Sequence, residues 1–406
     1  MNTGDTAWLL AATTLVLFMT VPGLAVYYGG LVRATNVLSV AMQCFSIAAV
    51  VGVLWMVAGY SLSFGDSFVG FIGNLDHAFL WDIKAGTLRG TVPEMLFVMF
   101  ELTFAIITPA VMVGCYVERI KYPAVIVMSV LWSLLVYVPV CHWVWSDGGW
   151  LKGLGAMDFA GGLVVHTTAG VAALVIVSQL GRRQGFPHEL QPPHNPGLVA
   201  TGVGMLWVGW FGFNGGSFLV ADGNAAMALA STHFAACSAS IIWASLDWIR
   251  FRKPSLFGTV TGVIAGLAAV TPAAGYVGPL GALILGASGS GICFFTVNII
   301  KIKLNLDDSL DVFCVHGLGG ITGTLLVALL CVDAMGGTGV LVKSGIVLEQ
   351  FGVQALAAAA TAVWTAAMTF IIVKITGWLT GGIRVDWEDE LVGLDLATHG
   401  EKGYDF

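Results

Sequence analysis

Long apolar runs separated by short polar connections dominate the chain. A helix that spans a bilayer needs about 20 mostly apolar residues, and the runs of this sequence reach or exceed that length. The pattern therefore predicts an all-α integral membrane protein with eleven transmembrane helices. The predicted spans are residues 8–32, 37–64, 93–117, 122–144, 160–180, 197–219, 224–249, 255–275, 279–300, 309–332 and 345–378.

Basic residues fall mainly on one side of this predicted bundle, while Lys374 lies near the inner end of the last span. One side receives Lys84, Arg89, Lys152 and Lys343. The other side receives Arg33, Arg119, Lys121, Arg182, Arg183, Arg250, Arg252, Lys253, Lys301, Lys303, Arg384 and Lys402. Because short cytoplasmic loops carry an excess of Lys and Arg, we expect the N-terminus outside and the C-terminus inside.

The composition supports a membrane location and excludes other classes. Only 10% of the 406 residues are charged and 57% are hydrophobic, whereas a soluble domain carries about 25% charged residues. The net charge of −7 and the absence of a long basic run exclude nucleic acid as a partner. The seven cysteines form no C-x-x-C pair, so we expect neither a disulfide framework nor a thiolate metal site. The sequence predicts a membrane domain over 1–380 and a polar, acidic cytoplasmic tail over 381–406.

Two segments of the sequence resemble each other. Asp158 and His166 lie in DFAGGLVVHTTAG, and Asp308 and His316 lie in DSLDVFCVHGLGG. In each segment an acid precedes a Val-His pair, and small residues follow the histidine. The two segments open the fifth and the tenth predicted spans. Duplication is the preferred interpretation, and chance similarity between two glycine-rich segments is the alternative.

Duplication predicts two five-helix halves, at about 8–180 and 197–332, with the span at 345–378 as an extra helix. A half with an odd number of spans must insert with the opposite topology, as in transporters built from inverted repeats. Such a relationship would bring His166 and His316 together near the middle of the membrane.

His166 and His316 are the strongest candidates for a functional pair. Ionisable groups inside a bilayer are costly and usually functional, and two neighbouring imidazoles can share a hydrogen bond and relay a proton. We therefore expect the pair to line a pore for a small polar substrate. Histidines that only pack between helices are one alternative, and a metal site, which lacks an evident third ligand, is another. His142 is expected near the outer interface, and His233 lacks a symmetric partner.

Aromatic residues cluster beside small and hydroxyl residues in WVGWFGFNGGS, MFELTF and CHWVW. Aromatic faces attract cations, so these clusters are candidates for a cation site. The alternative is an interfacial aromatic belt, and spacing alone does not decide between the two. Asp158, just before the fifth span, is expected to cap that helix. Gly258, Gly262 and Gly266 are spaced for close helix packing.

The segments WFGFNGGS, MDFAGGLVVH, DVFCVHG, VPGLAVYYGGLVR and GLDLATHGE together resemble the Amt/MEP/Rh ammonium transporters, in their bacterial Amt branch. The resemblance implies a homotrimer in the cell inner membrane with one pore per subunit. It also implies ammonium or ammonia as the substrate, no cofactor and no enzymatic activity. The tail resembles the segment that engages trimeric PII-type regulators in this family.

The resemblance also assigns roles to aromatic residues. Trp145, Ser217 and Phe104 resemble the outer site that recruits ammonium. Phe104 and Phe213 look like the stacked phenyl gate below that site, with Phe100 beside them.

Further roles follow from the same motifs. His166 and His316 resemble the twin-histidine pair, Trp210 a tryptophan that flanks the pore, and Asp158 a structural acid near the recruiting site. Glu101 departs from the pattern, because it stands where bacterial members commonly have glutamine. A carboxylate there is expected either to bind ammonium more tightly or to pair with a neighbour. The implied function is ammonium transport, and the alternative is an ammonium sensor with little or no flux.

Overall fold

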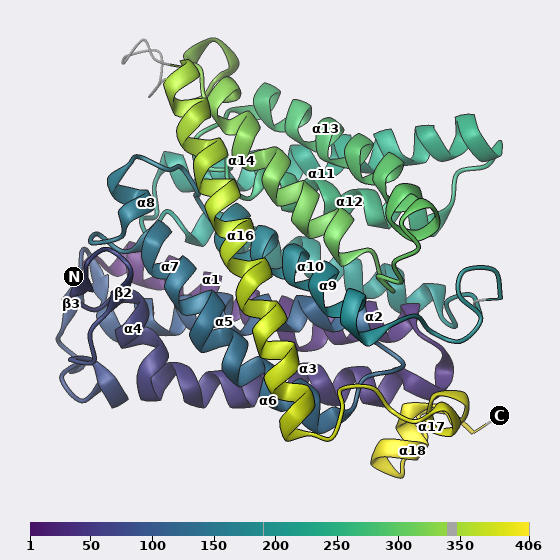
Figure 1. The fold of residues 1–406 in the computed structure, drawn as a ribbon. Coiled ribbons are helices and arrows are strands. Elements are labelled where there is room, and N and C mark those ends of the chain that lie inside the picture. Colours follow the sequence, from purple (N-terminus) through teal and green to yellow (C-terminus); the bar gives the residue numbers. More distant parts are fainter. Residues whose placement is uncertain (190, 339–346, 406) are drawn as a thin grey trace.

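The structure is a computed structural model that describes residues 1–189, 191–338 and 347–405. Long helices lie side by side in one bundle, and the long helix α16 crosses one face of it obliquely (Figure 1). The N-terminus lies beside the short strands β2 and β3, whereas the C-terminus lies with α17 and α18 at the opposite end (Figure 1). We call these ends the N-side and the C-side of the bundle.

Helices account for most of the described chain. The α-helices are α1 (Thr3–Phe18), α2 (Leu24–Leu31), α3 (Val37–Leu54), α4 (Tyr60–Phe64), α5 (Glu94–Tyr116), α6 (Tyr122–Trp132), α7 (Val138–Trp145), α8 (Trp150–Gly153), α9 (Thr168–Leu180), α10 (Pro196–Gly216), α11 (Gly223–Phe251), α12 (Leu256–Val270), α13 (Pro279–Asn298), α14 (Gly319–Leu330), α16 (Val347–Leu379), α17 (Trp387–Val392) and α18 (Leu394–His399). Short 3₁₀ turns are η2 (Ala34–Asn36), η4 (Ala78–Leu80) and η9 (Asp333–Met335). The strands β1 (Ser67–Phe68), β2 (Ile72–Gly73), β3 (Leu88–Arg89) and β4 (Val92–Pro93) form two antiparallel hairpins.

Ten helices within the described residues are long and apolar enough to cross a membrane. They are Thr3–Leu31, Ala34–Phe64, Glu94–Tyr116, Tyr122–Gly153, Gly162–Leu180, Pro196–Gly216, Gly223–Phe251, Pro279–Lys303, Phe313–Leu330 and Val347–Leu379. The remaining predicted span, 255–275, coincides with the shorter apolar helix Leu256–Val270. The chain is therefore a multi-pass, all-α membrane protein. Residues 345 and 346 of the last predicted span lie outside the described residues.

Many of the long helices contain a π-helical turn. These turns are η1 (Met19–Gly23), η3 (Trp55–Gly59), η5 (Ser133–Tyr137), η6 (Gly162–Thr167), η7 (Ile299–Lys303) and η8 (Phe313–Leu318). A π-turn inserts one residue into the helical repeat and is frequent at functional sites. Both histidines of the repeated segments lie in such turns, His166 in η6 and His316 in η8.

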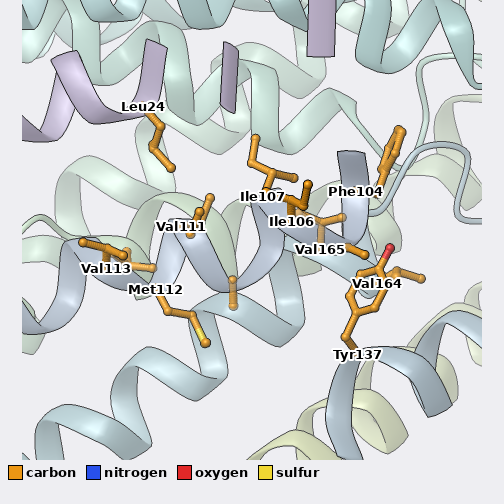
Figure 2. Packing of buried hydrophobic residues seen from close by; sticks show 14 of the residues in the cluster. Leu24, Phe104, Ile106, Ile107, Val111, Met112, Val113, Tyr137, Val164 and Val165 are labelled. Carbon is orange, nitrogen blue, oxygen red and sulfur yellow. The ribbon is translucent and has the colours of Figure 1, made fainter. Parts of the chain in front are cut away.

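Helix α5 runs through the centre of the apolar core. Figure 2 shows buried side chains of α5, among them Ile106, Ile107 and Val111, beside Val164 and Val165 of η6. Lipid tails are as apolar as the helix surfaces, so the hydrophobic effect contributes little to helix association in a membrane. Close packing, which small residues allow, therefore holds such a bundle together.

The predicted glycine ladder of α12 packs closely against α11. A Cβ atom built on Gly262 would lie 2.8 Å from the Ala239 carbonyl oxygen, and one on Gly266 would lie 2.5 Å from the Ala239 Cβ. A Cβ atom built on Gly258 would lie 2.1 Å from the Asp247 carboxylate, which also belongs to α11. The close-packing role expected from the four-residue spacing is confirmed, because only glycine fits these positions.

The C-terminal segment docks against the C-side end of the bundle. The Arg33 guanidinium donates to the Glu390 carbonyl oxygen (2.6 Å), and the Glu390 carboxylate accepts from the Gln184 backbone N–H (2.9 Å) and from Arg384 (2.6 Å). The Asp395 carboxylate accepts the Leu38 and Ser39 N–H groups at the start of α3. The tail is thereby held by groups from two other parts of the chain, residues 33–39 and Gln184, and by an ion pair within the tail itself.

Candidate pore

His166 and His316 meet in the centre of the bundle. Their Nδ1 atoms are 3.2 Å apart, their ring centres are 5.2 Å apart, and both residues are buried. In a hydrogen bond between two Nδ1 atoms one ring donates and the other accepts. When both rings are neutral, the donating ring therefore has a bare Nε2 acceptor and the accepting ring has an Nε2–H donor. His166 Nε2 is buried and has no hydrogen-bond partner within the described chain.

The glycines that follow the histidines pack reciprocally. Gly170 and Gly320 each stand four residues after one histidine. A Cβ atom on Gly170 would lie 2.2 Å from the Gly317 Cα, and one on Gly320 would lie 2.8 Å from the His166 Cβ. Each histidine segment thus presents a glycine to the other, and this allows the two backbones to approach.

The two acids that precede the histidines bond to helix amides, but to different extents. The Asp158 carboxylate accepts backbone N–H groups from Gly161, Gly162, Leu163 and Val164, at 2.6–3.1 Å. The corresponding Asp308 carboxylate accepts the Phe313 N–H at 2.7 Å, while its buried Oδ1 has no hydrogen-bond partner in the described chain.

A cavity that we call the N-side vestibule opens at the N-side end of the bundle. Its lining includes Phe97, Glu101, Phe104, Trp145, Ser217 and Arg89. The Trp145 indole donates to the Asp158 carbonyl oxygen (2.9 Å) and stands edge-on to Phe104, with ring centres 5.6 Å apart. Ser217 donates to the Phe213 carbonyl oxygen (2.8 Å). The predicted recruiting residues therefore share one cavity.

Two phenyl rings separate this vestibule from the histidines. The ring centres of Phe104 and Phe213 are 4.2 Å apart, and both rings are buried. Phe104 lines the vestibule, whereas Phe213 lines the cavity that contains both histidines. Phe100 packs against Phe104 at 5.0 Å and stands behind the pair.

The central cavity around the histidines is otherwise apolar. Trp210 stacks on His166 with ring centres 5.5 Å apart, and its indole N–H donates to Thr271. The remaining wall includes Met19, Leu24, Ile107, Val165, Leu206 and Ile264. The imidazole nitrogens are thus the main polar groups available to a molecule in this cavity.

Tyr27 joins the central cavity to a second vestibule on the C-side. Tyr27 lines both cavities, and the C-side vestibule also includes Thr261, Lys301 and Asp311. Lys301 and Asp311 form an ion pair at 2.8 Å. Three separate cavities in the described chain therefore follow one another, with the phenyl pair between the first two and Tyr27 between the last two.

Buried ion pairs surround the loop that leads to His316. Arg183 pairs with Glu118 (3.1 Å) and Asp307 (2.8 Å), while Arg119 donates to the Asp307 carbonyl oxygen (2.6 Å). Burial opposes ionisation of Asp307, but hydrogen bonding and attraction from Arg183 lower its pKa below the ordinary value. Burial and repulsion from Asp311 instead raise the pKa of Asp308 to about 6.

Two lining residues were not predicted from the sequence, and one predicted interfacial histidine is covered by a loop. His142 lies in the last turn of α7, is buried, and bonds to Ser67 (2.7 Å) and to the Ser63 carbonyl oxygen (2.9 Å). Tyr27 and Arg89 gave no sequence signal, because they lie far from the other lining residues along the chain. Within the described residues no cluster of three or more His, Cys, Asp or Glu side chains could hold a metal ion.

The sequence profile of the Ammonium Transporter Family matches residues 7–404. The chain belongs to the ammonium transporter family. It is 43% identical to the ammonium transporter of Bacillus subtilis, covering 100% of this chain and 99% of that protein. It is 44% identical to the ammonium transporter of Aquifex aeolicus, covering 100% and 94% of the two chains. These relatives are transporters rather than enzymes.

Solved structures of this family share the fold. Candida albicans Mep2 is 33% identical with a TM-score of 0.88, over 96% of this chain and 88% of that chain. A protein described as a sensor Amt protein is 27% identical with a TM-score of 0.90, over 97% of this chain and 98% of that chain. Ammonium transporter relatives and Amt/Mep neighbours therefore agree on family and fold.

Proposed function

We propose that this member of the ammonium transporter family carries ammonium across the cytoplasmic membrane. The observation that carries the proposal is a buried imidazole pair in an otherwise apolar cavity, between two vestibules and behind two phenyl rings. An apolar passage with a few polar atoms suits a small neutral molecule better than an ion, because an unpaired ion there loses its hydration.

Recruitment takes place in the N-side vestibule. Trp145 and Phe104 present aromatic faces and edges to the cavity, and a desolvated cation over such a ring gains about 2 kcal/mol. The Ser217 hydroxyl proton is engaged by the Phe213 carbonyl oxygen, so its oxygen lone pairs accept from an ammonium N–H. Asp158 keeps this site in shape through Trp145 and through the start of η6.

Ammonium gives up its proton to solvent water in the N-side vestibule before it passes the phenyl pair, and ammonia continues alone. Phe104 and Phe213 form the gate, with Phe100 as the support behind Phe104. In the central cavity ammonia meets one bare imidazole nitrogen and one imidazole N–H, which match its donors and its lone pair. His166 and His316 carry the proton separately, and Trp210 holds the His166 ring in position.

Topology and assembly complete the proposal. The N-side faces outward and the C-side faces the cytoplasm, in agreement with the bias of basic residues and with termini at opposite ends of the bundle. We propose eleven spans, with inverted halves at about 8–180 and 197–332 and an extra helix at about 345–378. The membrane domain, 1–380, assembles as a homotrimer in the inner membrane, and the tail, 381–406, is the contact for a PII-type regulator.

Electrophysiology on a solid-supported membrane tests this function. Proteoliposomes that contain the purified protein are expected to give a sustained, saturable current on ammonium jumps and a smaller one with methylammonium. The sensor alternative rests on the structural likeness to the sensor Amt protein. Ammonium binding with no sustained charge transfer would contradict transport and favour the sensor.

A further inference from the structure

Arg89 is fixed at the rim of the N-side vestibule. It lies in β3, where Arg89 pairs with Val92 of β4 in the hairpin that leads into α5. Its guanidinium carbon lies 4.4 Å from the ring centre of Phe97 and 5.2 Å from that of Phe64. Its Nη1 donates to the Tyr60 hydroxyl at 3.4 Å. The Arg89 side chain thus occupies a cation–π position of its own.

Glu101 lies one helical turn beyond Phe97 on α5. Residues four apart share a helix face, so Glu101 follows the ring on which Arg89 sits. Both side chains line the N-side vestibule. The Glu101 Oε2 atom is buried and has no hydrogen-bond partner within the described chain. The side chain of Glu101 can therefore interact with a cation inside the cavity.

The other charges that line the vestibule in the described chain are already paired. Asp147 and Lys152 form an ion pair at 2.7 Å. The Tyr60 hydroxyl donates to Glu94 at 2.7 Å, which fixes the group that accepts from Arg89. Among the described lining residues, Arg89 and Glu101 are left as the two ionisable side chains outside any ion pair of 4 Å or less.

We propose that Arg89 is a specificity-determining residue: a built-in cation that opposes Glu101 and sets how tightly and how selectively the vestibule holds ammonium. The inference rests on the proposed role of this vestibule in recruiting ammonium. A carboxylate alone attracts any monovalent cation, whereas the Ser217 oxygen adds a hydrogen bond only for a cation that carries N–H groups. The positive charge of Arg89 offsets the attraction of Glu101 for cations in general. The difference in affinity between ammonium and potassium then depends mainly on hydrogen bonding.

The test compares charge variants by ammonium-evoked current and by the inhibition that potassium causes. Arg89→Gln is expected to lower the ammonium KM by about fivefold and the potassium inhibition constant by a larger factor, because the unopposed Glu101 attracts both cations and hydrogen bonding then contributes less to the choice between them. Glu101→Gln is expected to raise both, and the double variant should return toward wild type. Arg89→Lys keeps the charge, so its shift should be smaller than that of Arg89→Gln. The matched control is Lys84→Gln, which removes a positive charge from an exposed position in the same loop, outside the vestibule lining.

Equal KM values for wild type and Arg89→Gln would overturn the inference. So would equal shifts in Arg89→Gln and Arg89→Lys, which would indicate that Arg89 only shapes the hairpin. Calorimetric titration with ammonium repeats the comparison without flux. If the wild-type protein binds ammonium but carries no current, the transport proposal is contradicted. The ammonium affinities of wild type and Arg89→Gln then still test the role of Arg89. Absence of both binding and current would defeat both proposals.

Discussion

Gly170 and Gly317 lie backbone against backbone, so close that a Cβ atom on Gly170 would stand 2.2 Å from the Gly317 Cα. Gly170 follows His166 by four residues and Gly317 follows His316 directly. The 3.2 Å separation of the two imidazoles therefore depends on the absence of a methyl group at this contact.

Gly170→Ala is expected to separate the two histidine segments. The added methyl group has no free space, so we expect destabilisation by about 1–3 kcal/mol and a large loss of ammonium current. Thermal unfolding in detergent and current in proteoliposomes measure the two effects. Gly204→Ala is the control, because a Cβ atom on exposed Gly204 meets nothing within 4 Å. Wild-type stability and current in the Gly170→Ala variant would show that the close approach is not needed.

Replacing His166 and His316 together by leucine is expected to abolish ammonium-evoked current. Apolar side chains preserve much of the packing but leave no group that carries a proton, and loss of such a group costs about 100-fold or more. His233→Leu serves as the control, since His233 is exposed on α11 and lines none of the three cavities described above. Undiminished current in the double variant would rule out the relay role.

Glu390→Gln is expected to loosen the tail. The substitution removes the charge that pairs with Arg384 at 2.6 Å and weakens the bond from the Gln184 backbone, a loss of about 1 kcal/mol for a partly exposed pair. Limited proteolysis of the C-terminal segment should then be about fivefold faster. Glu388→Gln, an exposed change in the same helix, should leave the rate unaltered. If both variants are cut at the wild-type rate, the Glu390 contacts do not hold the tail.

The raised pKa of Asp308 predicts that the stability of the folded protein depends on pH. Burial and the nearby Asp311 raise its folded-state pKa from 3.8 to about 6, so the folded protein binds this proton more tightly than the unfolded chain does. Stability from this group is present at low pH and is lost as the pH rises through 6. Lowering the pH from 7 to 5 should therefore add on the order of 1 kcal/mol.

Thermal midpoints of wild type and Asp308→Asn at the two pH values check this sign. The variant should lose the gain seen in the wild-type protein. The carboxylates whose pKa values are lowered, Glu118 and Asp307, act in the opposite direction, but only as the pH falls below their ordinary range near 4. Identical pH responses in the two proteins would contradict the assignment to Asp308.

The sequence was informative where a physical constraint leaves a pattern along the chain. Bilayer thickness sets the length of apolar runs, so the spans could be predicted to within a few residues for most helices. The repeated acid and histidine spacing likewise predicted that His166 and His316 would meet. Spacing did not select which aromatic residues line the passage, since Phe104 and Phe213 come from α5 and α10 and meet only in the folded bundle. Arg89 could not be found because a short loop hairpin carries no periodic signal.

Asp158 and Asp308 hold equivalent places in the two repeated segments, yet one carboxylate is saturated by four amides and the other keeps a buried oxygen without a partner in the described chain. The segment before His316 is held instead by the ion pair of Asp307 with Arg183 and by the hydrogen bond from Arg119 to the Asp307 carbonyl oxygen. The two histidine segments are therefore anchored in different ways, the first by its own helix amides and the second by charged side chains from elsewhere in the chain.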